Sequence, residues 1–147
     1  MKTNTIELYI HIPFCKSKCR YCDFCSFRAE EETIHAYLGK LKEELIFWGK
    51  KLAARDVVTV FIGGGTPSYL RREDIQMICE TIFEHFHICE DAEITIEANP
   101  GTVDLKKLCT YRENGINRIS FGLQSTVKEE LEYLGRIHTY EEFLQSF

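Results

Sequence analysis

The stretch "YIHIPFCKSKCRYCDFCSF", residues 9–27, joins a short apolar segment directly to a cysteine-rich loop. Apolar and polar residues alternate over "IELYIHI", residues 6–12. This period of two residues is typical of a β-strand with one buried face. The loop that follows carries four cysteines, Cys15, Cys19, Cys22 and Cys25. The sequence therefore predicts a strand whose C-terminal end delivers several thiols to one place.

The rest of the chain continues this alternation of strands and helices. Apolar residues at spacings of three and four residues predict helices, at 34–52, 72–87, 104–115, 127–134 and from 140 onward. The stretches between them predict three further strands, at 57–62, 92–98 and 117–125. The strand at 57–62, "VVTVFI", is a run rich in β-branched residues, which predicts a parallel strand covered on both faces.

Four successive strand–helix units predict an α/β fold with a parallel sheet and right-handed crossovers, either doubly wound or a (β/α) barrel. The alternating strands favour the barrel, with helices outside and a ligand cavity inside. Tyr9, His11, Glu97 and Gln124 are expected on the inner face. The cysteine loop, "GGGTPS", "EANPG" and "GLQS" then meet at the C-terminal ends of the strands, where such folds hold their sites. Four strands cannot close a barrel, so we expect a partial barrel with an open edge.

Composition narrows the class of protein. The 147 residues form about one domain, and no apolar run approaches the ~20 residues that a membrane helix needs. Seven cysteines, clustered rather than spread, favour metal binding or thiolate chemistry in a reducing compartment over a disulfide framework. We therefore expect a cytoplasmic protein. With 23 acidic and 18 basic residues the net charge is −5, which favours a small-molecule partner over nucleic acid.

Cys15, Cys19 and Cys22 stand in the pattern C-x3-C-x2-C. Closely spaced thiolates on a short irregular loop can surround an iron-sulfur cube. Three ligands on four irons would leave one iron open to a substrate, as in catalytic zinc sites with an open position. The alternatives are a structural zinc site, redox-sensing thiols and incidental cysteines. Cys25 extends the pattern by another C-x2-C, so it is either a fourth ligand or a spare thiol. The later cysteines, Cys79, Cys89 and Cys109, are expected within helices or at their ends.

The segment "LYIHIPFCKSKCRYCDF" resembles the signature of radical S-adenosylmethionine (SAM) proteins, specifically of oxygen-independent coproporphyrinogen III oxidases and their heme-chaperone relatives. "FIGGGTPS", "ITIEANPGT", "GINRISFGLQS" and "LGRIHT" resemble the same family in the same order. The resemblance implies that residues 1–147 are the N-terminal part of a radical SAM core domain. We expect the first four βα units of its barrel here, with the family's C-terminal part absent from the chain.

The resemblance also implies roles by position. Cys15, Cys19 and Cys22 would hold a [4Fe-4S] cluster whose open iron binds SAM, and an electron would cleave SAM to methionine and a 5′-deoxyadenosyl radical. The expected SAM-binding residues are Tyr9, Tyr21, Gly64, Gly65, Thr66, Glu97, Gln124 and Arg136. The glycines would allow close approach of the backbone, Glu97 would meet the ribose hydroxyls, and Arg136 would pair with the carboxylate. For His11 and His138, a structural role stands beside proton transfer.

One position separates the two branches of this family. The oxidases carry an additional cysteine as C-x-C after the third ligand, where this chain has Phe24, and Cys25 comes one residue later as in the heme chaperones. We therefore expect a heme chaperone-like protein that binds SAM and heme or a porphyrin, with an electron donor such as flavodoxin or ferredoxin. The alternatives are a coproporphyrinogen III oxidase that performs SAM-dependent oxidative decarboxylation, a non-enzymatic iron-sulfur or metal-binding module, and an inactive truncated fragment.

Overall fold

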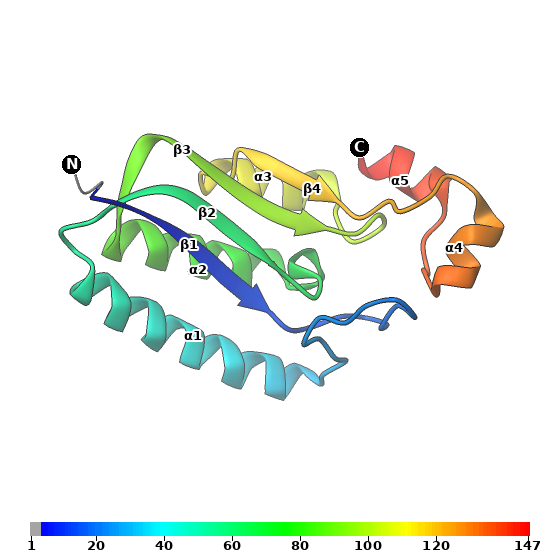
Figure 1. Cartoon of the computed structure of the whole chain (residues 1–147), viewed down its shortest axis with the longest axis horizontal. Coiled ribbons are helices and arrows are strands. Elements are labelled where there is room, and N and C mark those ends of the chain that lie inside the picture. Colours follow the sequence, from blue (N-terminus) through cyan, green and yellow to red (C-terminus); the bar gives the residue numbers. More distant parts are fainter. Residues whose placement is uncertain (1–3) are drawn as a thin grey trace.

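A computed structural model describes residues 4–147 as an α/β structure (Figure 1). The strands are β1 (Thr5–Ile12), β2 (Asp56–Gly64), β3 (His87–Ala98) and β4 (Arg118–Phe121). The helices are α1 (Glu31–Lys51), α2 (Arg72–His85), α3 (Leu105–Glu113), α4 (Lys128–Leu134) and α5 (Tyr140–Ser146), with a short 3-10 helix, η1 (Pro67–Tyr69). Each strand–helix unit expected from the sequence is therefore present.

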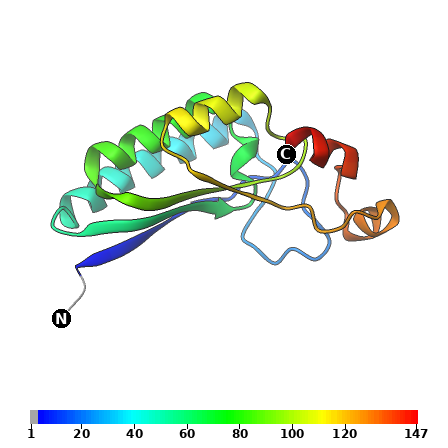
Figure 2. The ribbon, with the colours of Figure 1, turned by 90° about the horizontal axis from the view of Figure 1, so that it is seen from above.

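The four strands form one sheet in the order β1-β2-β3-β4, and every neighbouring pair is parallel. Figure 2 shows α1, α2 and α3 together on one side of this sheet. A doubly wound sheet would carry helices on both faces, whereas in a (β/α) barrel the helices cover only the outside. Sequential strand order with helices on one face is the arrangement of a barrel segment.

The core lies between the sheet and these helices. One face of the strands supplies buried apolar side chains, among them Ile10, Ile12, Val60, Ile62, Ile94 and Ile96. The helices supply the opposing layer, which includes Leu38, Leu41, Leu45, Ile75, Ile78 and Ile82. Removing this apolar surface from water is the main stabilising contribution to the fold.

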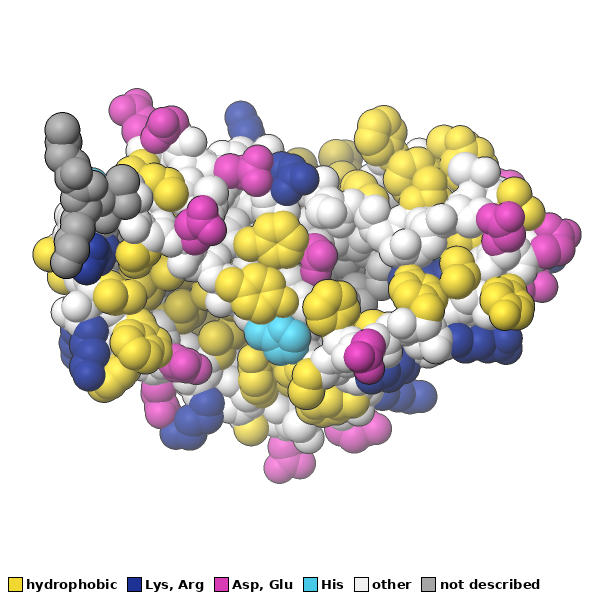
Figure 3. All heavy atoms as spheres, viewed as in Figure 1, with side chains coloured by type: hydrophobic (Ala, Val, Ile, Leu, Met, Phe, Trp, Pro, Cys, Tyr) yellow, Lys and Arg dark blue, Asp and Glu magenta, His cyan; other side chains and the backbone are white. Residues whose placement is uncertain are grey.

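The opposite face of the sheet is uncovered, so the expectation that the strand at 57–62 is buried on both faces is wrong. Val58 and Phe61 are only partly buried, because no helix packs on that side. Hydrophobic side chains gather over the middle of this open face (Figure 3). Tyr9 is 56% exposed there and stacks on Phe61 with ring centroids 6.1 Å apart.

Two strand boundaries also differ from the expected ones. β3 begins at His87, because Phe86 adopts an extended backbone after α2 and His87 and Ile88 pair with the start of β2. Cys89 therefore lies in a strand, whereas Cys79 and Cys109 lie in helices as expected. β4 ends at Phe121, and Gln124 has a φ of 68°. A residue in that left-handed region interrupts the extended conformation that a strand requires.

Local sequence signals account for the ends of α3. The Asp104 side chain accepts a hydrogen bond of 2.8 Å from the Lys107 backbone N–H, which caps the first turn. Gly115 follows the helix with a φ of 85°, a conformation that glycine adopts without a steric penalty. Among residues 4–147, no helix is both long enough and apolar enough to cross a membrane.

The buried position of Ile96 generates a stability prediction. Ile96 is 0% exposed in β3, so Ile96→Ala should lower the free energy of unfolding by about 2–5 kcal/mol through lost burial and a residual cavity. Leu105→Ala is the control, because Leu105 is 75% exposed and should change stability by less than about 0.5 kcal/mol. Urea denaturation followed by circular dichroism measures both, and equal effects would contradict this assignment of the core.

Candidate functional site

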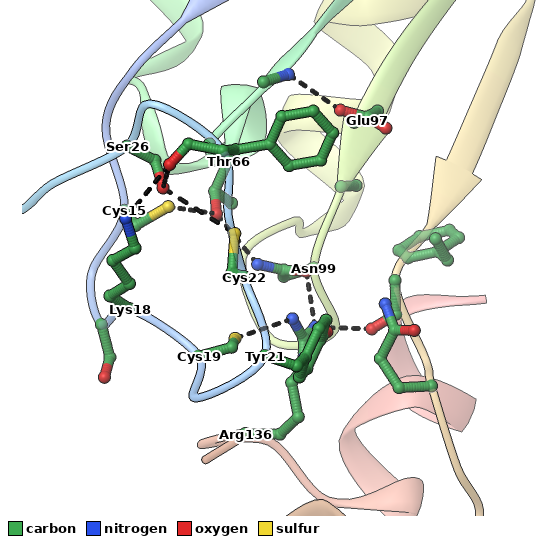
Figure 4. A pocket seen from close by; sticks show the side chains of 18 of the residues that line it. Cys15, Lys18, Cys19, Tyr21, Cys22, Ser26, Thr66, Glu97, Asn99 and Arg136 are labelled. Carbon is green, nitrogen blue, oxygen red and sulfur yellow. Dashed lines mark hydrogen bonds between the residues drawn. The ribbon is translucent and has the colours of Figure 1, made fainter. Parts of the chain in front are cut away.

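The carboxyl ends of all four strands open onto one cavity of about 240 Å³ (Figure 4). Its walls come from the cysteine loop, the glycine segment after β2, the ends of β3 and β4, and the segment after α4. Every expected site residue except Tyr9 lines it: Cys15, Cys19, Tyr21, Cys22, Gly64, Gly65, Thr66, Glu97, Gln124 and Arg136. Residues that are far apart in the sequence therefore share one cavity.

Tyr9 lies outside this cavity, on the open face of the sheet. Its hydroxyl is 3.1 Å from His11 Nδ1, and partial burial, with the nearby charge of Glu97, raises the pKa of that hydroxyl. His11 Nε2 lies 3.1 Å from the backbone carbonyl oxygen of Cys25. Because a carbonyl only accepts, Nε2 carries the hydrogen and Nδ1 accepts from Tyr9. In this arrangement His11 connects the sheet to the cysteine loop.

The base of the cysteine loop is closed by main-chain hydrogen bonds. Cys15 N–H donates to Phe27 O at 3.0 Å, and Phe27 N–H donates to Pro13 O at 2.9 Å. Phe14 is completely buried and meets the rings of Phe27 and Tyr37 edge-on. These contacts hold the two ends of the loop together, while the segment that carries the cysteines keeps an irregular backbone.

The three expected ligand thiols have different surroundings. Cys15 is buried, and the Thr66 hydroxyl donates to its Sγ at 3.5 Å. Cys19 Sγ receives a hydrogen bond of 3.4 Å from Arg136 Nη1. Hydrogen-bond donors close to sulfur compensate the negative charge of a thiolate ligand. Cys25 is exposed and does not line the cavity.

Among the described residues, no three His, Cys, Asp or Glu side chains converge closely enough to hold one metal ion. That criterion concerns the ligands of a single ion. In an iron-sulfur cube each thiolate binds a different iron, so the sulfurs need to surround the cube rather than meet at one point. Cys15, Cys19 and Cys22 line one cavity in this way.

Glycine is required where the second strand meets the cysteine loop. A Cβ atom on Gly65 would lie 2.7 Å from Phe14 O and 3.0 Å from Cys15 Sγ. Gly64 has a φ of 115°, which L side chains rarely adopt. Its N–H donates to Glu97 Oε2 at 2.9 Å, so the glycine segment also positions the carboxylate at the end of β3.

Asn99 is a polar residue of the cavity that the sequence patterns did not identify, and the same holds for Ser17, Lys18, Ser26 and Ser120. Asn99, in the segment "EANPG", donates from Nδ2 to Thr66 Oγ1 at 2.9 Å and accepts at Oδ1 from Arg136 Nη2 at 2.6 Å. Its position directly after a strand whose end reaches the site was the signal that could have identified it. Asn99 therefore connects two residues that were expected to bind SAM.

The chemistry of these side chains fits a cluster together with a ligand that bears a carboxylate. Thiols suit iron, and a guanidinium suits a carboxylate. Arg136 Nε is buried and has no hydrogen-bond partner among the described residues, and an unpaired buried donor is costly. Arg136 also lines the cavity, where its guanidinium can pair with a carboxylate.

The model of the radical SAM superfamily matches residues 9–147, and the chain belongs to this superfamily. Membership implies a [4Fe-4S] cluster and SAM as cofactors. Within the superfamily, the chain is 43% identical to the heme chaperone HemW of Escherichia coli (strain K12) over 143 residues. It is 38% identical to the heme chaperone HemW of Bacillus subtilis (strain 168) over 140 residues.

A solved structure agrees with the fold assignment. The coproporphyrinogen III oxidase HemN of Escherichia coli, a radical SAM enzyme, superimposes with a TM-score of 0.88 and 32% sequence identity over 96% of this chain. This similarity confirms the partial-barrel prediction. The matches cover 97% and 95% of this chain for the two HemW proteins. They cover 38% and 37% of those proteins and 33% of the HemN chain, so this chain spans well under half the length of each.

Gly65 lies so close to Phe14 and Cys15 that adding one methyl group there should disturb the cysteine loop. Gly65→Ala should push the cysteine loop away from β2 and lower the iron and sulfide content after anaerobic reconstitution severalfold. Gly39→Ala is the matched control, because a Cβ there meets nothing within 4 Å. In the middle of α1 it should stabilise the chain by roughly 0.5–1 kcal/mol. Equal iron content in both variants would show that the close approach does not matter.

Proposed function

We propose that the protein binds a [4Fe-4S] cluster through Cys15, Cys19 and Cys22, binds SAM in the adjoining cavity, and acts as a heme chaperone-like member of its superfamily. The proposal rests on one arrangement of the cysteine loop. Three cysteines line the cavity while Cys25 lies outside it. A site with three thiolates leaves one iron of the cube available to SAM.

Different residues around the cavity would bind different parts of SAM. Gly64 and Gly65 allow the methionine part to approach the backbone, and Arg136 supplies a charged partner for its carboxylate. Glu97 already accepts from Gly64 N–H with one oxygen, and its other oxygen can accept from a ribose hydroxyl. When both cofactors are bound, the reduced cluster supplies the electron that cleaves SAM. An electron donor such as flavodoxin or ferredoxin is part of this proposal, as is a cytoplasmic location.

The heme-chaperone assignment is supported by relatives and by one position in the loop. Both HemW proteins are described as heme chaperones and are more similar in sequence to this chain than the HemN oxidase is. Phe24 occupies the position where the oxidases carry an additional cysteine, and it lines the rim of the cavity. A phenyl ring cannot supply a thiolate there. Because the more similar relatives are heme chaperones, heme or a porphyrin is proposed as the further ligand of the protein.

The different places of the cysteines generate a test of the three-ligand site. Cys19→Ala should abolish the reconstituted cluster, seen as loss of iron, sulfide and the visible absorption band, because one iron loses its thiolate. Cys25→Ala should retain close to the full iron content and unchanged SAM binding, since Cys25 is exposed outside the cavity. Loss of the cluster in both Cys19→Ala and Cys25→Ala would instead favour the closed four-cysteine module.

A second experiment separates the chaperone from the oxidase. A form extended to the full length of the relatives, incubated anaerobically with coproporphyrinogen III, SAM and a reductant, should release no carbon dioxide above background. The same form should bind heme, measured by the shift of the Soret band on titration. Release of carbon dioxide in proportion to the SAM consumed would favour the oxidase instead.

A further inference from the structure

Asn99 connects two hydrogen-bond donors that reach ligand sulfurs, the Thr66 hydroxyl and the Arg136 guanidinium. Its Nδ2 donates to Thr66 Oγ1 at 2.9 Å, and Thr66 Oγ1 donates to Cys15 Sγ at 3.5 Å. Its Oδ1 accepts from Arg136 Nη2 at 2.6 Å, and Arg136 Nη1 donates to Cys19 Sγ at 3.4 Å. One amide group therefore contacts both the hydroxyl that donates to Cys15 and the guanidinium that donates to Cys19 (Figure 4).

The direction of each hydrogen bond follows from the chemistry of the partners. A guanidinium only donates, so the oxygen of the Asn99 amide must face Arg136 and its NH2 group must face Thr66. Once the Thr66 hydroxyl oxygen accepts from Asn99, its own hydrogen is free to point at Cys15 Sγ. The opposite orientation of the amide would place two donors against each other. Arg136 thus sets the orientation of Asn99, and Asn99 sets the orientation of the Thr66 hydroxyl.

The backbone of Asn99 is held independently of its side chain. Its N–H donates to Ser68 Oγ at 3.2 Å, and its carbonyl oxygen accepts from Thr102 Oγ1 at 2.6 Å. Ser68 Oγ and Thr102 Oγ1 are 2.5 Å apart. Lys107 Nζ donates to the carbonyl oxygens of Ser68 and Thr102 at 2.6 and 3.0 Å. These contacts fix the main chain from which the Asn99 side chain projects toward Thr66 and Arg136.

Gly122 provides the space that this contact needs. A Cβ atom at Gly122 would lie 2.8 Å from Asn99 Oδ1 and 3.3 Å from Arg136 Nη2. The carbonyl oxygen of Gly122 also accepts from Arg136 Nη2 at 2.5 Å. The guanidinium is therefore held between the end of β4 and Asn99, with its other terminal nitrogen directed at Cys19.

We infer that Asn99 is a positioning residue that directs the Thr66 hydroxyl and the Arg136 guanidinium onto the sulfurs of Cys15 and Cys19. The inference rests on the proposed cluster site. Hydrogen bonds to ligand sulfurs help to set the reduction potential of an iron-sulfur cluster. Donors stabilise the more negative, reduced state, so Asn99 raises the potential. Its effect falls on two of the three ligands, Cys15 and Cys19. The contact of the Cys22 sulfur within residues 4–147 is instead with the Ser26 hydroxyl, at 4.0 Å.

The test is the midpoint potential of the reconstituted cluster, followed by electron paramagnetic resonance during a redox titration. Asn99→Ala removes the hydrogen bonds to both Thr66 and Arg136. The ratio of reduced to oxidised cluster at a fixed potential should then fall about tenfold, which is about 59 mV for a one-electron couple. Combining it with Thr66→Val should give less than the sum of the single effects, because Asn99 acts partly through Thr66. Additive shifts, or no shift in Asn99→Ala, would overturn the inference.

Asn117→Ala is the matched control. Asn117 also makes two side-chain hydrogen bonds, to Ile94 N and Ala92 O, but at the opposite end of the sheet. It should lower the melting temperature without moving the potential. Equal shifts in potential for Asn117→Ala and Asn99→Ala would show that Asn99 has only a structural role.

If Asn99→Ala fails to fold or to hold a cluster, Gly122→Ala decides the question. This variant removes no polar group and only crowds Asn99 and Arg136, so its potential should shift in the same direction by less. An unchanged potential in Gly122→Ala would then overturn the inference and leave the proposed function intact. Failure of the unsubstituted chain to form any cluster would overturn both.

Discussion

The arrangement of the site depends on two main-chain hydrogen bonds beyond the end of the paired strands. Gly65 N–H donates to Ile12 O at 2.7 Å, and Thr66 N–H donates to Phe14 O at 2.8 Å. They extend the parallel pairing of β1 and β2 into the start of the cysteine loop. Because a Cβ at Gly65 would collide with Phe14 O, this contact is possible only with glycine. It brings the Thr66 hydroxyl to Cys15 and fixes the first thiol against the second strand.

The parallel sheet extends this local contact into a complete cavity. Because all neighbouring strands are parallel, every carboxyl end points the same way, so each following segment reaches the same edge. The helices cover one face, which leaves the other as the inner surface of a barrel segment (Figure 2). The proposed coordination of iron, the proposed binding of SAM and the proposed role of Asn99 all depend on side chains that lie at this edge.

Much of this structure was predictable from local patterns. Period-two alternation identified β1, and three-and-four spacing identified α1 and α2. The cysteine spacing predicted a ligand loop, and three of its cysteines line the cavity. The errors came from interactions that no local pattern contains. The apolar run at 57–62 is typical of a strand buried on both faces, yet only the presence of helices on each side would decide that. The extension of β3 to His87 depends on pairing with β2, and the short β4 reflects pairing with β3 over Arg118–Phe121 alone.

The sequence by itself determined the order of strands and helices, the three-cysteine pattern and the superfamily, because these depend on residue type and on spacing along the chain. Only the tertiary structure decided which polar residues meet. It placed Tyr9 on the open face of the sheet, outside the cavity. It also placed Asn99 between Thr66 and Arg136. Hydrogen bonds between segments tens of residues apart depend on the register of strands and the path of loops, and neither is encoded in any single segment.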